Sequence, residues 1–286
     1  MLYPADDTDM IDEARNILTD ALDKHQPVAV RLLFSGGHDS LVSTHVASRI
    51  LDSVGAPHRV LHIDTTVGIP ENEQYVKDCS DRFGWDLRII RNDEHRGKSY
   101  DEWVRDEETF PFPQDHIWTY INLKRNAIEQ VVREVKEEQN DRVLLVTGVY
   151  ADESDRRAGF HQIEKRRGAQ VWVNPCFEWS EADMGQYRLQ NDLPVNEVAA
   201  ELGKSGECLC GAYAHPGDLE AVRRVCPALA ERFDRLSKEI SPSPAHEMKW
   251  DMDEIPEQWK QEANGQCDAF REAPDLVQPL CHDCTR

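Results

Sequence analysis

The residues with the clearest potential for chemistry form one short loop, Ser35-Gly36-Gly37-His38-Asp39-Ser40. Two adjacent glycines let the backbone approach a ligand closely, and hydroxyl groups stand at both ends of the loop. An apolar run at 28–34 before the loop predicts a buried strand, and helical spacing of apolar residues after it predicts a helix. A helix N-terminus that follows a glycine turn presents partially positive N–H groups to an anion. The sequence therefore predicts a site for the phosphate group of a nucleotide.

The loop matches the pattern SGGxDS and lacks the GxxxxGK[ST] spacing of a Walker A loop. It resembles the pyrophosphate loop of the adenine-nucleotide α-hydrolase-like superfamily. That superfamily includes N-type ATP pyrophosphatases, ATP sulfurylase small subunits and phosphoadenosine-phosphosulfate (PAPS) reductases. The resemblance implies ATP bound with Mg²⁺, phosphates held by residues 35–40, and a catalytic role for Asp39.

Two further segments resemble the PAPS-reductase-like branch of this superfamily. His62-Ile-Asp64-Thr-Thr66, followed by Ile69-Pro-Glu71, is similar to its second-strand segment, which implies that Asp64 and Thr65 lie beside the adenosine. Leu123-Lys124-Arg125 is similar to a helix that brings a catalytic lysine, here Lys124, to the phosphates. Outside a family context, Asp64 is equally well a strand-end cap, and a Lys-Arg pair is most often solvated surface.

The segment Thr147–Arg157 resembles the family pattern G-x-R-x-x-E-S-x-x-R. The resemblance places Gly148 and Glu153 at the cofactor and gives Arg156 and Arg157 catalytic roles, because guanidinium groups bind phosphate oxygens bidentately. The first arginine of the pattern is Tyr150 here, so we expect this contact to be replaced, for example by stacking of the ring.

The eight cysteines are unevenly placed, with six of them in the last third of the chain. Their CxC and CxxC spacings indicate metal binding rather than disulfides. The predicted ligands are four thiolates, at Cys208, Cys210, Cys281 and Cys284. They suit a [4Fe–4S] cluster or a structural Zn²⁺. We favour the cluster, because relatives that handle sulfur carry such clusters.

Other residues compete for the same metal. Cys267 and Cys226 are alternative ligands, although Cys226 lies in an apolar helical pattern that predicts a buried core cysteine. His215 and His282 are alternative zinc ligands or hydrogen-bond donors to the ligands. A purely structural metal, which holds the C-terminal segment in place, is the simpler explanation of the clustered cysteines.

Strands must position these groups, and apolar runs predict them at 28–34, 59–63, 85–90, 142–146 and 171–173. Apolar spacing predicts helices at 9–24, 39–51, 70–83, 117–139 and 219–236, and one that begins after Ser180 with Asp183 in its first turn. Residues 91–115 are polar and interrupted by prolines, which predicts an irregular loop. This alternation predicts an α/β fold with a parallel twisted sheet and helices on both faces. The loop 35–40, Asp64 and Gly148 follow strands directly, and ligands bind where such strands end.

We expect two domains, a nucleotide-binding α/β domain at 1–200 and a helical and irregular cysteine-rich region at 201–286. From residue 240 onward the chain loses its periodicity. This part has little capacity to form a core without a metal to staple it.

Composition limits the class of protein. Hydrophobic residues make up 40% and charged residues 30%, which is typical of a globular chain. No run approaches the roughly 20 apolar residues of a membrane span, and the N-terminus is polar, so we expect a cytoplasmic protein. The net charge of −21 argues against nucleic-acid binding at ordinary ionic strength. It is also typical of proteins adapted to a salty cytoplasm, where a Debye length of about 3 Å at 1 M removes that objection.

Three functions follow from these observations and the resemblance. The first is an ATP pyrophosphatase that adenylates an acceptor for sulfur transfer. Its closest type is the DndC and SspD proteins of DNA phosphorothioation, which implies DNA, a cysteine desulfurase and companion proteins as partners. The second is a sulfonucleotide reductase. The segment most similar to the C-terminal Glu-Cys-Gly-x-His motif of reductases is Glu207-Cys208, but a second cysteine follows it and it lies too far from the C-terminus. The third is a nucleotide-binding subunit without catalysis.

Overall fold

The computed structural model describes residues 7–91, 93, 97–112, 116–150, 162–212, 214 and 217–240. Within these ranges the chain divides into two compact units, each of which is described by itself. The first unit comprises 1–62, 75–89 and 129–195, and the second comprises 63–74, 90–128 and 196–286. Among the described helices, none combines the length and apolar character needed to cross a bilayer.

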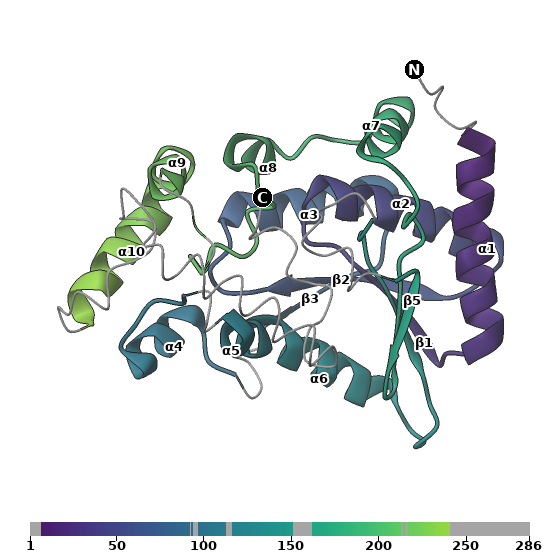
Figure 1. The fold of residues 1–286 in the computed structure, drawn as a ribbon, viewed down its shortest axis with the longest axis horizontal. Coiled ribbons are helices and arrows are strands. Elements are labelled where there is room, and N and C mark those ends of the chain that lie inside the picture. Colours follow the sequence, from purple (N-terminus) through teal and green to yellow (C-terminus); the bar gives the residue numbers. More distant parts are fainter. Residues whose placement is uncertain are drawn as a thin grey trace. The chain divides into compact units, whose positions relative to one another are not determined.

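A six-stranded sheet forms the framework (Figure 1). Its strands are β1 (Ala29–Leu33), β2 (His58–Asp64), β3 (Leu87–Arg91), β4 (Val143–Val146), β5 (Glu164–Arg167) and β6 (Gln170–Val173). Their order is β3-β2-β1-β4-β6-β5. The pairs β1–β2, β1–β4 and β4–β6 are parallel, whereas β5 pairs antiparallel to β6. A mostly parallel sheet with helices against it confirms the predicted α/β class, whereas most of the predicted cysteine-rich C-terminal region, from residue 241 onward, lies outside the described residues.

The strand sequences explain their positions in the sheet. Every residue of β4 and β6 is buried, as expected for inner strands of a parallel sheet covered on both faces. The missed strand β5 has the sequence Glu-Lys-Arg-Arg and lies at the edge. Charged side chains protect an edge strand from pairing with other chains, and they also remove the apolar alternation by which a strand is predicted.

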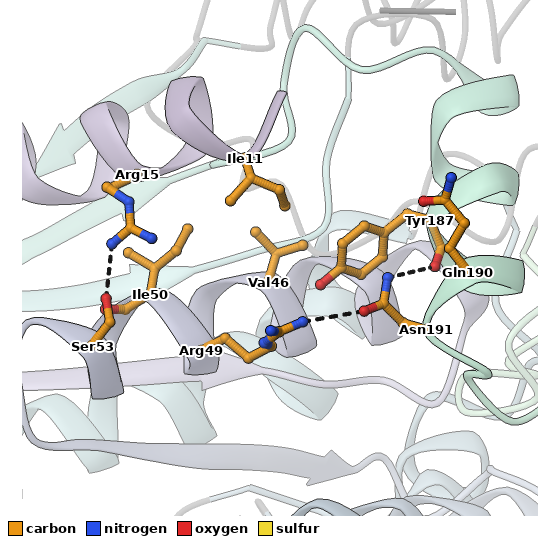
Figure 2. A pocket seen from close by; sticks show the side chains of 9 residues that line it. All are labelled: Ile11, Arg15, Val46, Arg49, Ile50, Ser53, Tyr187, Gln190 and Asn191. Atoms are coloured by element: carbon orange, nitrogen blue, oxygen red, sulfur yellow. Dashed lines mark hydrogen bonds between the residues drawn. The ribbon is translucent and has the colours of Figure 1, made fainter. Parts of the chain in front are cut away.

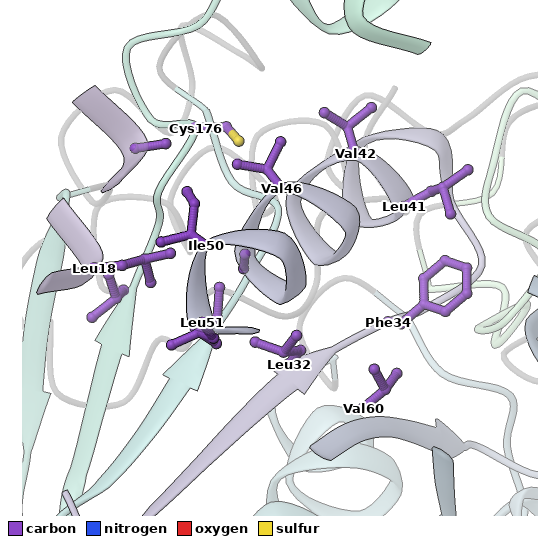
Figure 3. Close-up of a cluster of buried hydrophobic side chains, with 14 of the residues drawn as sticks. Leu18, Leu32, Phe34, Leu41, Val42, Val46, Ile50, Leu51, Val60 and Cys176 are labelled. Carbon is purple, nitrogen blue, oxygen red and sulfur yellow. The ribbon is translucent and has the colours of Figure 1, made fainter. Parts of the chain in front are cut away.

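Three helices of the first unit pack together against this framework. They are α1 (Asp7–His25), α2 (His38–Ser53) and α7 (Glu181–Gln190). Figure 3 shows side chains of α1, α2 and β1 converging, among them Leu18, Ile50, Leu51 and Leu32, each at most 2% exposed. The predicted cap of α7 is confirmed: Ser180 and Asp183 form a capping box.

The remaining helices include two that span both units. These are α3 (Pro70–Phe83), at the predicted bounds, and α6 (Asn126–Val135). In the second unit lie α4 (Tyr100–Glu107), α5 (His116–Tyr120), the π-helical turn η1 (Ile121–Arg125), α8 (Glu197–Leu202), α9 (Asp218–Val225) and α10 (Pro227–Glu239). A second hydrophobic cluster, distinct from that of the first unit, holds α4, α9 and α10 together.

Two of the predictions for this unit were wrong. Residues 91–115 were expected to be irregular, yet α4 forms there. A capping box between Ser99 and Glu102 begins the helix, and buried apolar residues along it hold it in place. The single helix predicted at 219–236 is broken at Cys226, because Pro227 disfavours helical backbone in the residue before it. Cys226 itself is 6% exposed within the second cluster, which confirms it as a core cysteine.

Candidate nucleotide-phosphate site

The loop 35–40 is held in shape by its own hydrogen bonds. The hydroxyl of Ser40 donates to the carbonyl oxygen of Gly37 (2.9 Å), and the Oγ atoms of Ser35 and Ser40 lie 3.0 Å apart. Because the one hydroxyl proton of Ser40 is used on Gly37, Ser35 is the donor of this pair. The N–H of Gly37 donates to Oγ of Ser35 (3.3 Å), and Gly36 has a φ of 90°, which favours glycine. These hydrogen bonds close the turn on itself.

Helix α2 continues directly from this turn. Its N-cap is Gly37, which has no side chain with which to cap the first N–H groups of the helix. Asp39 lies in the first helical turn and is half-buried. The turn therefore ends in a helix N-terminus, a position whose partial positive charge attracts anions.

The turn after β4 closes against the loop through a glycine. A Cβ atom on Gly148 would lie 2.8 Å from the carbonyl oxygen of Asp39 and 2.8 Å from both N and Cα of Ser40. Real Cβ atoms essentially never come so close, and all three neighbours are backbone atoms. Glycine at 148 is thus required by the contact between the two turns.

Buried hydrogen bonds join the ends of three elements around this contact. Ser43 of α2 donates to the carbonyl oxygen of Thr147 (2.8 Å), and the hydroxyl of Thr147 donates to Oδ1 of Asn174, directly after β6. Asn174 in turn donates from Nδ2 to the carbonyl oxygen of Gln162 (2.8 Å). The first three of these residues are at most 4% exposed. Fully satisfied polar networks of this kind fix the geometry of the strand ends.

The location of this assembly has a topological reason. The strand order reverses between β1 and β4, because β2 and β3 lie on one side of β1 and β4 on the other. Ligands of open α/β sheets bind at such a switch point, outside the carboxyl ends of the strands. The loop 35–40 follows β1 and Gly148 follows β4, so both flank the crevice that the topology prescribes.

In the second unit, the end of β2 is tied to the loop that contains Cys208. The carboxylate of Glu207 accepts from the N–H of Thr65 (2.8 Å) and from Nδ2 of Asn72 (3.3 Å), and the hydroxyl of Thr65 donates to the carbonyl oxygen of Glu207 (2.6 Å). A Cβ atom on Gly68 would meet that same carbonyl oxygen at 2.9 Å. Thr65, Asn72 and Glu207 are at most 4% exposed. The two segments therefore form one rigid piece.

A second link runs through α4 to the other cysteine. Oγ1 of Thr66 accepts from the N–H of Tyr100 (2.7 Å), and the hydroxyl of Tyr100 donates to the carbonyl oxygen of Cys210 (2.8 Å). Next to Thr66, burial raises the pKa of Asp64, an effect that the N–H of Thr66 and the guanidinium of Arg91 offset only in part. The Cys208–Cys210 turn is thus positioned from two sides by the residues that follow β2.

The described cysteines differ in their chemistry. Among the described cysteines, no disulfide joins Cys79, Cys176, Cys208, Cys210 or Cys226 to another. Burial raises the pKa of Cys79 to about 11 and that of Cys176 further still, so neither is a nucleophile near neutral pH. Cys208 is half-exposed and Cys210 is 1% exposed.

The described part of the chain contains no group of three or more metal-ligating side chains. It supplies two of the four predicted thiolates, Cys208 and Cys210. Cys210 is itself buried in the second hydrophobic cluster, and a tetrahedral metal or a cluster at Cys208 and Cys210 would need two more ligands. Cys281 and Cys284, like the competing Cys267, His215 and His282, lie outside the described residues.

The other predicted site residues are distributed as follows. Lys124 lies in the π-helical turn η1 and is 7% exposed; π-helical turns are frequent at functional sites. Tyr150 is 2% exposed within the first hydrophobic cluster, so its ring is part of the core, and its contact with a ligand stays a prediction. Asp64, Thr65 and Lys124 belong to the second unit, and their sharing of one site with loop 35–40 also stays a prediction. Glu153, Arg156 and Arg157 lie outside the described residues.

Sequence reasoning missed several residues that shape these segments. Ser43 and Asn174 were given no role, Thr147 was noted only as the first residue of a segment that resembles the family pattern, and Glu207 was noted only for its neighbour Cys208. Their partners are between 27 and 142 positions away in the chain. Polar residues directly after strands are the signal that could have identified Thr147 and Asn174.

Comparisons with known proteins agree with this geometry. The sequence profile of the phosphoadenosine phosphosulfate reductase domain matches residues 29–204. An uncharacterized protein of Methanocaldococcus jannaschii is 26% identical over 222 residues, which cover 73% of this chain and 48% of that protein. A phosphoadenosine 5'-phosphosulfate reductase of Xanthomonas axonopodis pv. citri is 25% identical over 221 residues, which cover 76% of this chain and 82% of that enzyme. The chain spans about half the length of the first of these relatives.

Solved structures show the same fold. The NMN synthetase of Francisella tularensis superposes with a TM-score of 0.53 at 11% identity, covering 96% of this chain and 98% of that one. This likeness concerns the fold alone. The match of the domain profile to more than half of the chain is what shows the family: this protein belongs to the phosphoadenosine phosphosulfate reductase domain family.

Proposed function

We propose that this protein binds ATP with Mg²⁺, cleaves it between the α- and β-phosphates and transfers the adenylyl group to an acceptor that then receives sulfur. The observation that carries this proposal is the position of Asp39, a carboxylate in the first turn of α2 directly beside the phosphate loop. A carboxylate repels a phosphate anion at close range, unless a divalent cation lies between them. The loop is therefore suited to a metal-bound polyphosphate rather than to a bare phosphate.

The reaction requires little covalent chemistry from the protein. An oxygen of the acceptor attacks the α-phosphorus, the bond from that phosphorus to the α–β bridging oxygen breaks, and pyrophosphate leaves with the bond electrons. The closed turn 35–40 and the N-terminus of α2 stabilise the charge that develops on pyrophosphate. Lys124, Arg156 and Arg157 are predicted to add positive charge to the same phosphates, and Mg²⁺ held by Asp39 would supply further charge neutralisation there.

The sulfur step is proposed from the cysteines. Glu207 and Tyr100 hold the Cys208–Cys210 turn against residues that follow β2, where the family resemblance places the adenosine. A [4Fe–4S] cluster completed by Cys281 and Cys284 would supply a place to hold sulfur; structural Zn²⁺ is the alternative. A cysteine desulfurase as donor and the DNA backbone as acceptor complete the version that the DNA-phosphorothioation resemblance implies.

One observation favours a second function, a sulfonucleotide reductase. The Xanthomonas relative named as a reductase is matched over 82% of its length, and Cys208 is a half-exposed thiol directly after a buried glutamate. In this reaction the thiolate of Cys208 would attack the sulfur of the sulfonucleotide, and the bond from that sulfur to the phosphate oxygen would break to release the nucleotide. A dithiol would then release sulfite from the resulting S-sulfocysteine and be oxidised to a disulfide. The same fold would then bind PAPS or APS in place of ATP.

The two functions are separated by a product assay. Purified protein is incubated with α-labelled ATP and Mg²⁺, or with PAPS or APS and a dithiol, and AMP, pyrophosphate and sulfite are quantified. With water in place of the acceptor, we expect Mg²⁺-dependent release of AMP and pyrophosphate, reduced at least ~10²-fold in Asp39→Asn, the typical cost of losing one preorganised electrostatic group. Asp52→Asn, at the exposed end of the same helix, is the matched control and should leave the rate unchanged.

Each other outcome has a definite meaning. Release of sulfite that needs the dithiol and Cys208, without ATP cleavage, supports the reductase instead. Tight ATP binding without turnover, equal in Asp39→Asn and wild type, contradicts both enzymes and indicates a binding subunit. Supplying DNA or tRNA with a cysteine desulfurase then identifies the acceptor, by the appearance of labelled sulfur in the nucleic acid.

A further inference from the structure

A cavity of about 570 Å³ lies on the first unit, between helices α1, α2 and α7 (Figure 2). Its volume is within the range of about 300–1,000 Å³ that small-molecule sites occupy. It is built on the second half of α2, from Val46 to Ser53, whereas the phosphate loop precedes the first turn of that helix. None of its lining residues has a role in the proposed nucleotide site.

The floor of the cavity is apolar. Ile11 of α1 and Val46 and Ile50 of α2 line it, and in Figure 2 they lie between the guanidinium of Arg15 and the ring of Tyr187. Val46, Ile50 and Tyr187 are at most 4% exposed, so they cannot move aside easily. This surface suits the body of a ring-sized apolar group.

The wall formed by Tyr187 is rigid. Its hydroxyl lies 2.9 Å from Nδ1 of His45, and its carbonyl oxygen accepts from Nδ2 of Asn191 (2.9 Å). Its ring contacts those of His45 and Trp179 with centroid distances of 5.7 and 5.5 Å. A ligand would therefore meet a preformed surface rather than a mobile side chain.

Two guanidinium groups border this floor without an acidic partner. Arg15 donates to Oγ of Ser53 (2.8 Å), and Arg49 donates to Oδ1 of Asn191 (3.2 Å), both neutral acceptors. Neither arginine forms an ion pair with any carboxylate in the described ranges, whereas Arg82 on α3 pairs with Asp192 (2.8 Å). In a chain that carries 54 acidic and 33 basic residues, two arginines beside one cavity without a carboxylate are a local excess of positive charge.

We propose that this cavity is a second ligand site, which binds a small amphipathic anion: a ring-sized apolar body that carries one carboxylate, sulfonate or phosphate group. The apolar body lies on Ile11, Val46 and Ile50, and the oxyanion takes hydrogen bonds from Arg15 or Arg49. Guanidinium groups bind such oxyanions through two parallel N–H donors. Ser53 and Asn191 already orient the two guanidinium groups, so little side-chain entropy is lost on binding.

The test uses 2-naphthoate and its neutral isostere 2-naphthamide as probes in equilibrium dialysis with the full chain. We expect saturable binding of one 2-naphthoate, at least about tenfold weaker binding of 2-naphthamide, and binding unaffected by saturating ATP and Mg²⁺. The double variant Arg15→Gln/Arg49→Gln should weaken 2-naphthoate about tenfold, which corresponds to ~1.4 kcal/mol. Arg235→Gln, an exposed arginine of α10, is the control and should change nothing.

Several results would overturn the proposal. They are an absence of saturable binding, equal affinity for the anion and the amide, and unchanged affinity in the Arg15→Gln/Arg49→Gln variant. Displacement of the probe by ATP would show that it occupies the nucleotide site. Sedimentation completes the test, because a probe that converts dimers to monomers would identify the cavity as an interface between copies of the chain. The comparison of the two probes on wild-type protein needs no variant, so it decides even if a substitution impairs folding.

Discussion

Gly148 offers the most direct test of how the phosphate loop is held. The substitution Gly148→Ala adds one methyl group and changes neither charge nor hydrogen bonding. The new Cβ would lie 2.8 Å from backbone atoms of Asp39 and Ser40. Ordinary van der Waals contact begins at 3.4 Å, so one of the two turns must retreat by about 0.6 Å. No flexible side chain is available to absorb this movement, because all three contacted atoms are backbone.

The magnitude follows from what this displacement disturbs. Overpacking of one methyl group in a close-packed site typically costs about 1–3 kcal/mol of folding free energy. The displaced atoms belong to the first turn of α2, and misplacement of a binding group by about 1 Å can reduce a rate ~10²-fold. We therefore expect Gly148→Ala to remain folded at 25 °C but to lose one to two orders of magnitude in nucleotide affinity or turnover.

The assay compares two glycines. Gly185 lies inside α7 with nothing within 4 Å of a Cβ atom, so Gly185→Ala should stabilise the fold by about 0.5–1 kcal/mol and leave nucleotide binding unchanged. Urea unfolding measures stability, and calorimetric titration with a non-hydrolysable ATP analogue and Mg²⁺ measures affinity. Wild-type affinity in Gly148→Ala would refute the reasoning, and so would an equal loss in Gly185→Ala.

Three further predictions concern Glu207, His45 and the cysteines. Glu207→Gln should lower the free energy of unfolding, measured in urea, by about 1–3 kcal/mol. The carboxylate of Glu207 accepts two hydrogen bonds, and the amide nitrogen of glutamine would face one of the two donors without accepting from it. An unchanged urea midpoint would show that the link to Thr65 is dispensable. His45 has its pKa lowered to about 4, by burial first and by nearby arginines second, so between pH 6.5 and 4 the unfolded chain binds a proton that the folded chain does not. The free energy of unfolding should therefore fall by about 1–2 kcal/mol, after allowance for solvent screening, as the pH drops through this window. His45→Asn should reduce this dependence of stability on pH. Parallel curves of stability against pH for the variant and the wild type would contradict the reasoning. After any bound metal has been removed with a chelator, iodoacetamide at pH 8 should label Cys208 in the folded protein but Cys176 only after unfolding. Mass spectrometry of folded protein that shows label on Cys176 would count against the assigned burial.

Most elements of the first unit could be predicted because their signals are local. The apolar runs at β1, β2, β4 and β6 and the helical spacing of α1 and α2 depend on residues a few positions apart. The elements that were missed lack such a signal: β5 is a charged edge strand, and α4 depends on a capping box within a polar segment. The break at Cys226 could have been read from the proline that follows it.

The candidate site divides in the same way. The sequence of strand, glycine turn and helix start around residues 35–40 could be predicted from local signals, whereas phosphate binding by this turn stays a prediction. The role of Gly148 could be expected only from resemblance, and its cause, a backbone contact with Ser40, is visible only in three dimensions. The link between Thr65 and Glu207 joins residues 142 positions apart, and no local pattern encodes it.

The sequence by itself determined the fold class, the glycine turn at 35–40 and the chemical types of the side chains around it, because strand, turn and helix propensities act over short distances. Only the tertiary structure decided which turns are in contact and which polar groups are buried with partners. It also placed two arginines, which have no carboxylate partner among the described residues, beside an apolar cavity. These features depend on packing between segments that lie far apart in the chain. Packing is a property of the whole fold, since each contact forms only when every intervening element has taken its place.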